Sequence, residues 1–223
     1  MPDLAIILPA YNVENTIQNV LTQLRLYFQQ AAIIVVNDGS TDRTGEILRQ
    51  FQDIHVIDHT ENLGKGAALK QGIELARAKI RPKFYAFIDS DGQHEAKDLF
   101  NLYQAARLNQ GDFLIGKRAF RFGSMPLARI ISNRLTSWLI SRKIGNRIAD
   151  SQSGMRIVSA AIIEQLPPLY SNGYEFESEF LLKAGRMPVR FFELPITTKY
   201  ADEQSHIRPL RDIYRFIRVF LSA

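Results

Sequence analysis

Two carboxylates in the segment Asp89-Ser90-Asp91-Gly92-Gln93-His94 are the residues best placed for chemistry. They lie two residues apart after an apolar run, so both can reach one divalent cation, and Gly92 allows the chain to turn. Carboxylate oxygens, with the amide oxygen of Gln93, suit Mg²⁺ or Mn²⁺ bridging the phosphates of a nucleotide, and His94 could add a nitrogen. The same residues also make a good solvated turn, and alone they do not decide between the two interpretations.

Two further segments have residue types that could bind a nucleotide. In 35–42, Asp38 follows an apolar run, and its carboxylate could accept hydrogen bonds from a nucleobase edge or a ribose; the alternative is a turn followed by a helix cap. In 61–66, two glycines and Lys65 at a helix start could offer N–H groups and a cation to phosphate. The spacing is not that of a Walker A loop, and no G-x-G-x-x-G follows the first strand, which argues against a dinucleotide cofactor.

Apolar runs that alternate with helical periodicity predict the elements that position these segments. We expect strands at 4–8, 32–36, 54–57, 84–88, 113–115 and 189–196, a short strand at the end of the 150–158 loop, and helices at 14–28, 44–51, 64–78, 98–107, 127–144, 174–184 and after Pro209. This pattern predicts an α/β fold with a mostly parallel sheet flanked by helices in a single domain. Because ligands of such sheets bind at the carboxyl ends of the strands, 9–12, 37–40 and 89–94 should share one edge.

The composition excludes several classes of protein. The 223 residues suit one domain, and the absence of cysteine excludes disulfides and thiolate metal sites. The chain has no run of about 18 apolar residues and no signal-peptide pattern. We therefore expect a cytoplasmic protein, with the inner face of the membrane as a peripheral location.

Positive charge is concentrated in the second half of the chain, although the net charge is only +5. No acidic residue lies between Lys117 and Arg147, whereas eight cations do. The pattern favours a polyanionic ligand or an anionic surface, with a solvated basic face as the alternative. Few aromatic residues lie among the cations, so nucleic acid is not the expected partner. The last helix could insert Ile213, Ile217 and Phe220 into a membrane, or pack them on the domain or a second subunit.

Several segments in this order resemble family 2 glycosyltransferases with the Rossmann-like GT-A fold. They are Pro9-Ala10-Tyr11-Asn12-Val13-Glu14, 35–42, 62–66, 89–93, 116–118, 150–156 and 173–177. The branch that they resemble is that of the polyprenyl- or dolichyl-phosphate mannosyl- or glucosyltransferases. The resemblance implies a glycosyltransferase domain over 1–200, with a nucleotide-binding half (1–116) and an acceptor half (117–200), and leaves 201–223 as a basic amphipathic helix.

The resemblance also implies a reaction and the residues that carry it. The reaction is an inverting, metal-dependent transfer of a sugar from a UDP- or GDP-sugar to an acceptor that is expected to be a phosphate, with polyprenyl phosphate as one candidate. The donor would lie on Pro9, Tyr11, Glu14, Asp38, Lys65 and Asp89. The metal ion would be held by Asp89, Asp91 and Gln93. Diphosphate and acceptor phosphate would contact Arg118, Arg129 and Asn133, and the candidate catalytic residues are Asp91, Arg118 and Asp150.

Two departures from the family pattern keep alternatives open. Asn37 stands where many relatives have Asp, and the transmembrane helices of many lipid-phosphate enzymes are absent from this sequence. A hydroxyl acceptor would need a general base, for which Asp150 is the first candidate and Glu177 the second, whereas a phosphate needs none. Asp150 could instead pair with Arg118 or Arg156. A nucleotide-sugar-binding protein without turnover, a soluble hydroxyl acceptor and a homodimer remain open.

Overall fold

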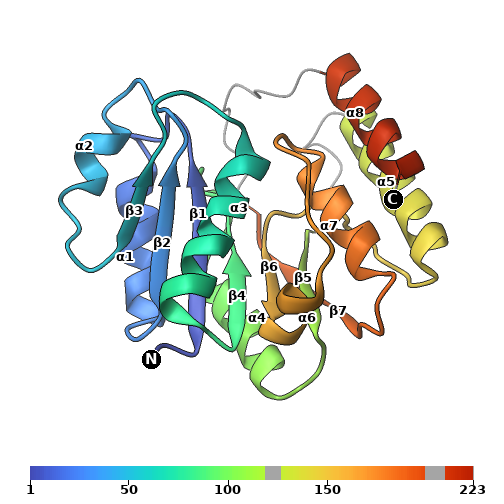
Figure 1. Ribbon diagram of the computed structural model, residues 1–223, viewed down its shortest axis with the longest axis horizontal. Coiled ribbons are helices and arrows are strands. Elements are labelled where there is room, and N and C mark those ends of the chain that lie inside the picture. The colour runs from blue at the N-terminus through green and yellow to red at the C-terminus, as the bar shows by residue number, and fades with distance from the viewer. Residues whose placement is uncertain (119–126, 199–208, 223) are drawn as a thin grey trace.

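A seven-stranded mixed sheet forms the centre of the molecule (Figure 1). The structure is a computed structural model that describes residues 1–118, 127–198 and 209–222, without the side chains of 127–129 and 209–213. The strand order is β3-β2-β1-β4-β6-β5-β7, and β6 alone among these strands runs antiparallel to its neighbours. The strands are β1 (Leu4–Ala10), β2 (Ala32–Asn37), β3 (His55–Asp58), β4 (Phe84–Phe87), β5 (Phe113–Arg118), β6 (Arg156–Ser159) and β7 (Phe191–Ile196).

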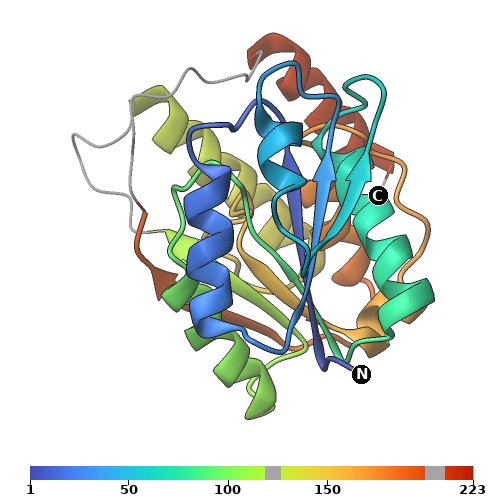
Figure 2. The same ribbon diagram turned by 90° about the vertical axis from the view of Figure 1, so that its left-hand side faces the viewer.

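Helices cover both faces of the sheet and give it two hydrophobic cores. One face packs on α1 (Ile17–Tyr27), α2 (Thr44–Leu48) and α4 (Ala96–Arg107), and Figure 2 shows α1 running alongside the strands on this side of the sheet. The other face packs on α3 (Lys65–Leu75), its π-helical continuation η1 (Ala76–Ile80), α5 (Leu127–Ile144), α6 (Ala160–Gln165) and α7 (Phe176–Ala184). The α/β class with a mostly parallel sheet is therefore confirmed.

Burial on both faces explains the unbroken apolar runs of the central strands. In β1, Ile6 faces the core below α1 and α4, while Ile7 faces the core below α3 and α7, and both are fully buried. Successive side chains of a strand point to opposite faces, so a strand covered twice needs apolar residues at every position. Parallel pairing of β1 with both β2 and β4 brings the carboxyl ends of these strands to one edge.

The last helix, α8 (Pro209–Ser222), lies against α7 and α5 (Figure 1). Phe216, Val219 and Phe220 pack on the hydrophobic core, and Lys143 of α5 donates a hydrogen bond to the carbonyl of Phe220. Of the alternatives left open for Phe220, the structure favours packing on the domain. Ile217 is exposed, and the side chain of Ile213 lies outside the described residues.

Most predicted elements agree with the structure to within a few residues. Helix α5 has the predicted limits, while the short helix α6 was not predicted because six residues carry little periodic signal. Strand β1 continues through Pro9 to Ala10, which places Pro9 opposite Val36 of β2. In the part of the chain that is described, no helix has the length and apolar character needed to cross a bilayer.

Candidate active site

Direct contacts bring the three predicted segments together at the carboxyl edge of the sheet. The Ser90 hydroxyl donates to the carbonyl oxygen of Pro9 at 2.6 Å, and the Thr16 hydroxyl donates to the carbonyl of Ser90 at 2.8 Å. The amide of Asn12 donates to the Ser40 hydroxyl at 3.0 Å. The loops after β1, β2 and β4 are therefore tied to one another, as the position of ligand sites in parallel sheets predicts.

Lys65 links two carboxylates at the centre of this edge. Its ammonium lies 2.7 Å from Asp89 Oδ1 and 2.8 Å from Glu177 Oε1, and all three side chains are largely buried. Burial alone would raise the pKa of the Asp89 carboxyl, but the charge of Lys65 outweighs it and holds that pKa below its usual value. Burial alone would lower the pKa of Lys65, yet the two carboxylates raise it above the ordinary value. Lys65 is thus the resident counter-ion of both acids.

The loop that follows Asp89 forms the tight turn expected of it. Gly92 has a φ of +77°, and the amide of Gln93 donates to Asp91 Oδ1 at 2.9 Å. Next to it, His94 is buried, its Nδ1 has no hydrogen-bond partner, and burial lowers the pKa of its ring. The backbone at Gly154 also packs closely against Asp89: a Cβ on Gly154 would come within 2.2 Å of Asp89 Oδ2.

The oxygen ligands that this loop offers fit a small divalent cation whose coordination is completed by substrate phosphate. Mg²⁺ is commonly held by one or two carboxylates together with substrate phosphates and water. Asp91 and Asp89 supply carboxylate oxygens and Gln93 an amide oxygen, whereas the described residues contain no cluster of three or more acidic, histidine or cysteine side chains suited to a metal.

Asp150 forms an ion pair with Arg118. Its Oδ2 accepts from Arg118 Nε at 2.7 Å and from the Arg118 amide at 3.1 Å, and its Oδ1 accepts from Nη2 at 2.9 Å. The Asp150 side chain is completely buried. Of the two interpretations left open by the sequence, this geometry favours the ion pair over a general base, because both oxygens are occupied. Glu177, the second candidate base, is also buried, with Oε1 paired with Lys65 and with no hydrogen-bond partner for Oε2 among the described residues.

Asp38 and Glu14 stabilise loops rather than project into open space. The Asp38 carboxylate accepts from the amides of Leu63 and Gly64 at 2.9 and 2.8 Å and lies 2.6 Å from His59 Nδ1. Glu14 accepts from the amide of Arg43 at 3.0 Å, at the start of α2. Their predicted contacts with the nucleoside therefore stay predictions, and their role in this structure is to hold the loops that would surround it.

The start of α3 is not the phosphate site suggested by its glycines. The amides of Gly66 and Ala67 donate to the carbonyl of Asn172 at 2.8 and 3.2 Å, and that of Gly64 donates to Asp38. These N–H groups are already satisfied, so the suggestion that they bind phosphate is wrong. The glycines are needed because the 171–173 segment lies directly on them: a Cβ on Gly64 would come within 2.3 Å of the Asn172 carbonyl oxygen.

Asp58 places a carboxylate beside Asn37, the position where many family members have Asp. Asn37 is buried, and its amide donates to Asp58 Oδ1 at 2.7 Å. Asp58 ends β3 and is exposed. The sequence analysis missed this carboxylate, and the pairing of β2 with β3 that places Asp58 opposite Asn37 could not be read from either segment alone.

The remaining predicted residues lie around this cluster. Pro9 and Tyr11 are half-buried at the end of β1. Asn133 is buried in α5, while the side chain of Arg129 lies outside the described residues. Arg156 donates to the carbonyls of Ser151, Ser153 and Glu177 at 2.8–3.0 Å, and so fastens the 150–153 loop to the start of α7.

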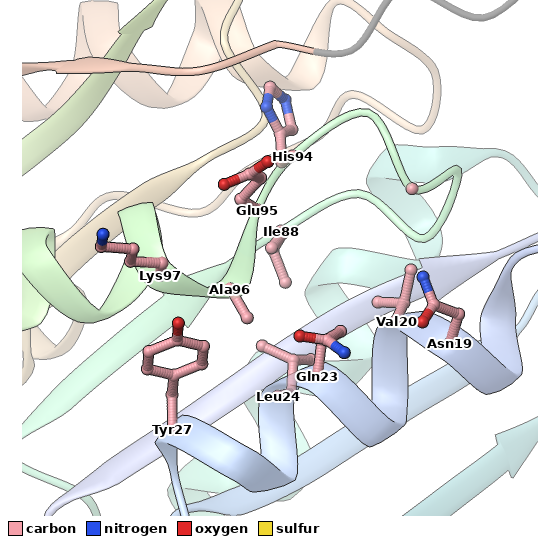
Figure 3. Close-up of a pocket in the computed structure, with 11 residues that line it drawn as sticks. Asn19, Val20, Gln23, Leu24, Tyr27, Ile88, His94, Glu95, Ala96 and Lys97 are labelled. Atoms are coloured by element: carbon pink, nitrogen blue, oxygen red, sulfur yellow. The ribbon is translucent and has the colours of Figure 1, made fainter.

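A pocket of about 350 Å³ lies on the outer side of the 92–97 segment, between α1 and the start of α4 (Figure 3). Asn19, Gln23 and Tyr27 of α1 line one wall, and Glu95 and Lys97 lie on the opposite wall. Asp89, Asp91 and Lys65 are not among its lining residues. The ion pair of Lys65 with Asp89 at the strand ends therefore lies outside this pocket, which borders the 92–97 segment.

The fold and the site define a glycosyltransferase with the GT-A fold. Residues 5–166 match the family model described as glycosyl transferase family 2, and the chain belongs to that family. It is 29% identical to the UDP-N-acetylglucosamine–dolichyl-phosphate N-acetylglucosaminyltransferase of Methanococcus voltae, over 88% of this chain and 86% of the relative. It is 28% identical to the undecaprenyl-phosphate mannosyltransferase of Micrococcus luteus, over 86% and 81%. The expected family and its lipid-phosphate branch are thus confirmed.

A solved structure supports the fold. The crystal structure of glucosyl-3-phosphoglycerate synthase from Mycobacterium tuberculosis with Mn²⁺, UDP and phosphoglyceric acid has a TM-score of 0.76 at 21% identity. The match covers 99% of this chain and 78% of that chain. At this identity the likeness establishes the GT-A architecture and does not transfer a substrate.

Proposed function

We propose that this glycosyltransferase moves a hexose from a UDP- or GDP-sugar to a phosphate acceptor, with inversion and with Mg²⁺ or Mn²⁺ as cofactor. The observation that carries the proposal is the convergence of Asp89, Asp91, Lys65 and Arg118 at the carboxyl edge of the sheet. Carboxylates that could hold a metal ion, beside cations that could face phosphate oxygens, suit a ligand that combines a metal ion with negatively charged phosphates.

The leaving group requires stabilisation of developing negative charge. A divalent ion held by Asp91, with Asp89 and Gln93, supplies Lewis-acid stabilisation of the diphosphate when it is bound. Lys65 and Arg118 are held in place by buried carboxylates, so their charges are fixed before substrate arrives. Such preorganised charge needs little rearrangement during the reaction, which is the main way in which electrostatic catalysis lowers a barrier.

The pairing of the candidate bases favours a phosphate as the acceptor. Asp150 has both oxygens on Arg118, and Glu177 faces Lys65 inside the protein. A hydroxyl acceptor needs a carboxylate able to take its proton, whereas a phosphate monoester is already anionic near neutral pH. The acid-free basic stretch from Lys117 to Arg147 suits an anionic acceptor, and the relatives named above act, by their names, on dolichyl and undecaprenyl phosphate.

A thermal-shift panel of nucleotide sugars with and without Mg²⁺ or Mn²⁺ tests the donor site. We expect stabilisation by UDP- or GDP-sugars only when metal is present, and its loss in Asp91→Ala. Asp53→Ala, which removes a solvent-exposed carboxylate just before β3, at the opposite edge of the sheet from the carboxyl ends, should keep the response. Stabilisation by every nucleotide without metal, unchanged in Asp91→Ala, would contradict the proposed site.

Transfer assays separate this function from its alternatives. A protein that only binds nucleotide sugars would respond in the thermal-shift panel but release no UDP or GDP with any acceptor. A hydroxyl-acceptor enzyme would release nucleotide with alcohols or sugars and not with polyprenyl phosphate in detergent. We expect polyprenyl phosphate to be the productive acceptor class, on the cytoplasmic face of a membrane. A homodimer remains a separate expectation that light scattering can test.

A further inference from the structure

Helix α5 places polar side chains inside the protein and apolar ones outside. Asn133, Thr136 and Ser137 are buried, although each is polar. In contrast, Ile131, Leu135 and Trp138 are 66%, 54% and 57% exposed. A surface helix of a soluble domain usually has the reverse arrangement, with its apolar side on the core.

The exposed apolar residues of α5 form one continuous stripe. Ile131, Leu135, Trp138 and Arg142 follow the spacing i, i+4, i+7 and i+11, which keeps them on one side of a helix. We call these four residues the α5 stripe. The opposite side of α5 carries Ile130 and Ile140, which are buried together with the polar residues. The stripe is therefore the outer surface of α5 and not a part of the domain core.

The inner side of α5 touches the candidate active site. The Ser137 hydroxyl lies 3.0 Å from the Ser151 hydroxyl and accepts from the Ser151 amide at 3.0 Å. Ser151 follows Asp150, the partner of Arg118. Because an α-helix with its side chains is about 10 Å wide, the stripe lies about one helix diameter from this loop. A surface that covers the stripe would therefore lie next to the site.

The charges around the stripe are of one sign. Arg134, Arg142 and Arg147 are exposed on or just after α5, and the sequence has no acidic residue from Lys117 to Ala149. Helix α8 lies beside α5 and adds exposed Tyr214, Ile217 and Leu221, with Arg218 among them. Apolar side chains interleaved with arginines match a surface that is negatively charged outside and apolar beneath.

We propose that α5 docks on an anionic phospholipid membrane through the α5 stripe, with the outer side of α8 as a second contact. Ile131, Leu135 and Trp138 enter the boundary between headgroups and acyl chains, and Arg134 and Arg142 contact lipid phosphates. The docking itself requires no lipid acceptor. Its role rests on the proposed function: it would bring a phosphate carried by a membrane lipid next to the candidate active site.

Charge favours a membrane over a second copy of the chain as the occupant. A two-fold dimer through the stripe would place the same patch on both sides of the interface. That arrangement would bring Arg134 and Arg142 of both copies together without an acidic residue from 117–149 to pair with them. Like charges at an interface are unfavourable, whereas phosphate headgroups neutralise both arginines.

Trp138 is the single tryptophan of the protein and reports directly on the stripe. The test adds vesicles of phosphatidylcholine, alone or with phosphatidylglycerol and without polyprenyl phosphate, and records tryptophan emission and co-flotation. We expect a blue shift and co-flotation with the anionic vesicles and a strong decrease at high salt, because surface charge is screened by salt. An unchanged spectrum with phosphatidylglycerol vesicles would overturn the proposal.

Matched variants then assign the effect to the stripe. Ile131→Ser with Leu135→Ser should lower vesicle affinity at least about tenfold, since each removes a large apolar side chain from the bilayer. Leu26→Ser with Leu108→Ser, which changes two similarly exposed leucines elsewhere, should not. Arg142→Glu should weaken binding by more than about fivefold, since one surface charge alone accounts for about that factor, whereas Lys79→Glu on η1 should not.

Two further results would refute membrane docking. One is vesicle affinity that the paired serine substitutions at Ile131 and Leu135 leave unchanged. The other is a concentration-dependent dimer in which Trp138 becomes buried without lipid, which would make a second copy the occupant. The metal-dependent thermal shift with nucleotide sugars should persist in all these variants. Failure of docking alone is therefore distinguishable from failure of the proposed glycosyl transfer.

Discussion

At the scale of single residues, the buried charges of the site depend on Lys65. It neutralises Asp89 and Glu177, which lie on the β4 loop and on α7 and would otherwise repel each other inside the protein. A buried ion pair is weak evidence of added stability, but removing one partner leaves an uncompensated charge. Lys65 is therefore a structural requirement of the site as well as a candidate phosphate contact.

Lys65→Met should destabilise the protein by about 3 kcal/mol at neutral pH, because two buried carboxylates lose their counter-ion. The pKa of Asp89 lies below its ordinary value of 3.8, so its contribution is present above that pH and is lost as the pH falls through the folded pKa. Lys65 has a raised pKa, so its contribution is present below 10.5.

In Lys65→Met, burial raises the pKa of Asp89, so the difference in unfolding free energy between wild type and variant should be largest near neutral pH. It should shrink as the pH falls through that raised pKa toward the lowered pKa of the wild type, and also as the pH rises above 10.5. Urea unfolding across this range measures it. Lys70→Met provides the control, because Lys70 makes one exposed hydrogen bond, to Asn172. A difference that stays unchanged down to pH 2.5 would argue against this role of Asp89.

Gly154→Ala should weaken metal-dependent nucleotide binding at least about tenfold. The added Cβ would lie 2.2 Å from Asp89 Oδ2, so the short Asp89 side chain must move from its place beside Lys65. Calorimetric titration with UDP and Mn²⁺ measures the loss. Gly116→Ala is the control: its Cβ would crowd Ile196 and Met155, so it should reduce stability and leave metal binding intact.

The sequence predicts the acidic loop but not its partners. Asp89, Asp91 and Gln93 are identifiable because they directly follow a buried strand, and such loops lie at the ligand edge of a parallel sheet. The pairing of Lys65 with Glu177 and of Asn37 with Asp58 joins residues far apart in the chain. No periodicity or spacing connects such residues, so these contacts require the fold.

At the scale of elements, the start of α3 depends on close approach of the 171–173 segment. Gly64 has a φ of +101°, and a Cβ there would meet the Asn172 carbonyl oxygen. We expect Gly64→Ala to cost about 3 kcal/mol, since it combines an unfavourable φ with a clash. Gly145→Ala has a similar backbone strain at φ +71° but open space around it, and should cost about 1 kcal/mol. Equal costs in urea unfolding would contradict the proposed contact.

Helix α8 is expected to contribute to stability through one side only. Phe216→Ala removes a ring that packs on the core, and should cost about 2 kcal/mol. Leu221→Ala, at a residue that is 76% exposed, should change stability by less than about 0.5 kcal/mol. Thermal or urea unfolding of the two variants measures the contrast. A similar loss in both would mean that the exposed side of α8 is also covered.

Helix periodicity identifies an element better than it identifies the buried side. The apolar positions of 127–144 predict α5 with its correct limits, yet Ile131, Leu135 and Trp138 face outward. The polar residues Asn133, Thr136 and Ser137 take the inner side because Ser137 meets the polar 150–153 loop. Which side of a helix is buried depends on the segments that pack against it. The helix sequence alone does not predict that a loop from another part of the chain will pack there.

At the scale of the whole molecule, the sheet joins the two halves suggested by the sequence. Strand β4 of the nucleotide-binding half pairs with β6, and β6 pairs with β5, so backbone hydrogen bonds run from β3 to β7 without interruption. Both hydrophobic cores contain residues from before and after position 116. The two predicted halves therefore share their packing, and we expect them to unfold together.

Matched substitutions in each half test this cooperativity. Leu8→Ala in β1 and Ile157→Ala in β6 remove completely buried side chains from the same hydrophobic core, each at a cost of about 3 kcal/mol. Native-state hydrogen exchange should show the slowest amides of β1, β2, β5 and β7 losing protection by the same free energy in either variant, because they open only in global unfolding. A loss confined to β1 and β2 in Leu8→Ala would instead mean that the nucleotide-binding half opens alone, and the preorganised charges of Lys65 and Arg118 would then belong to separate units.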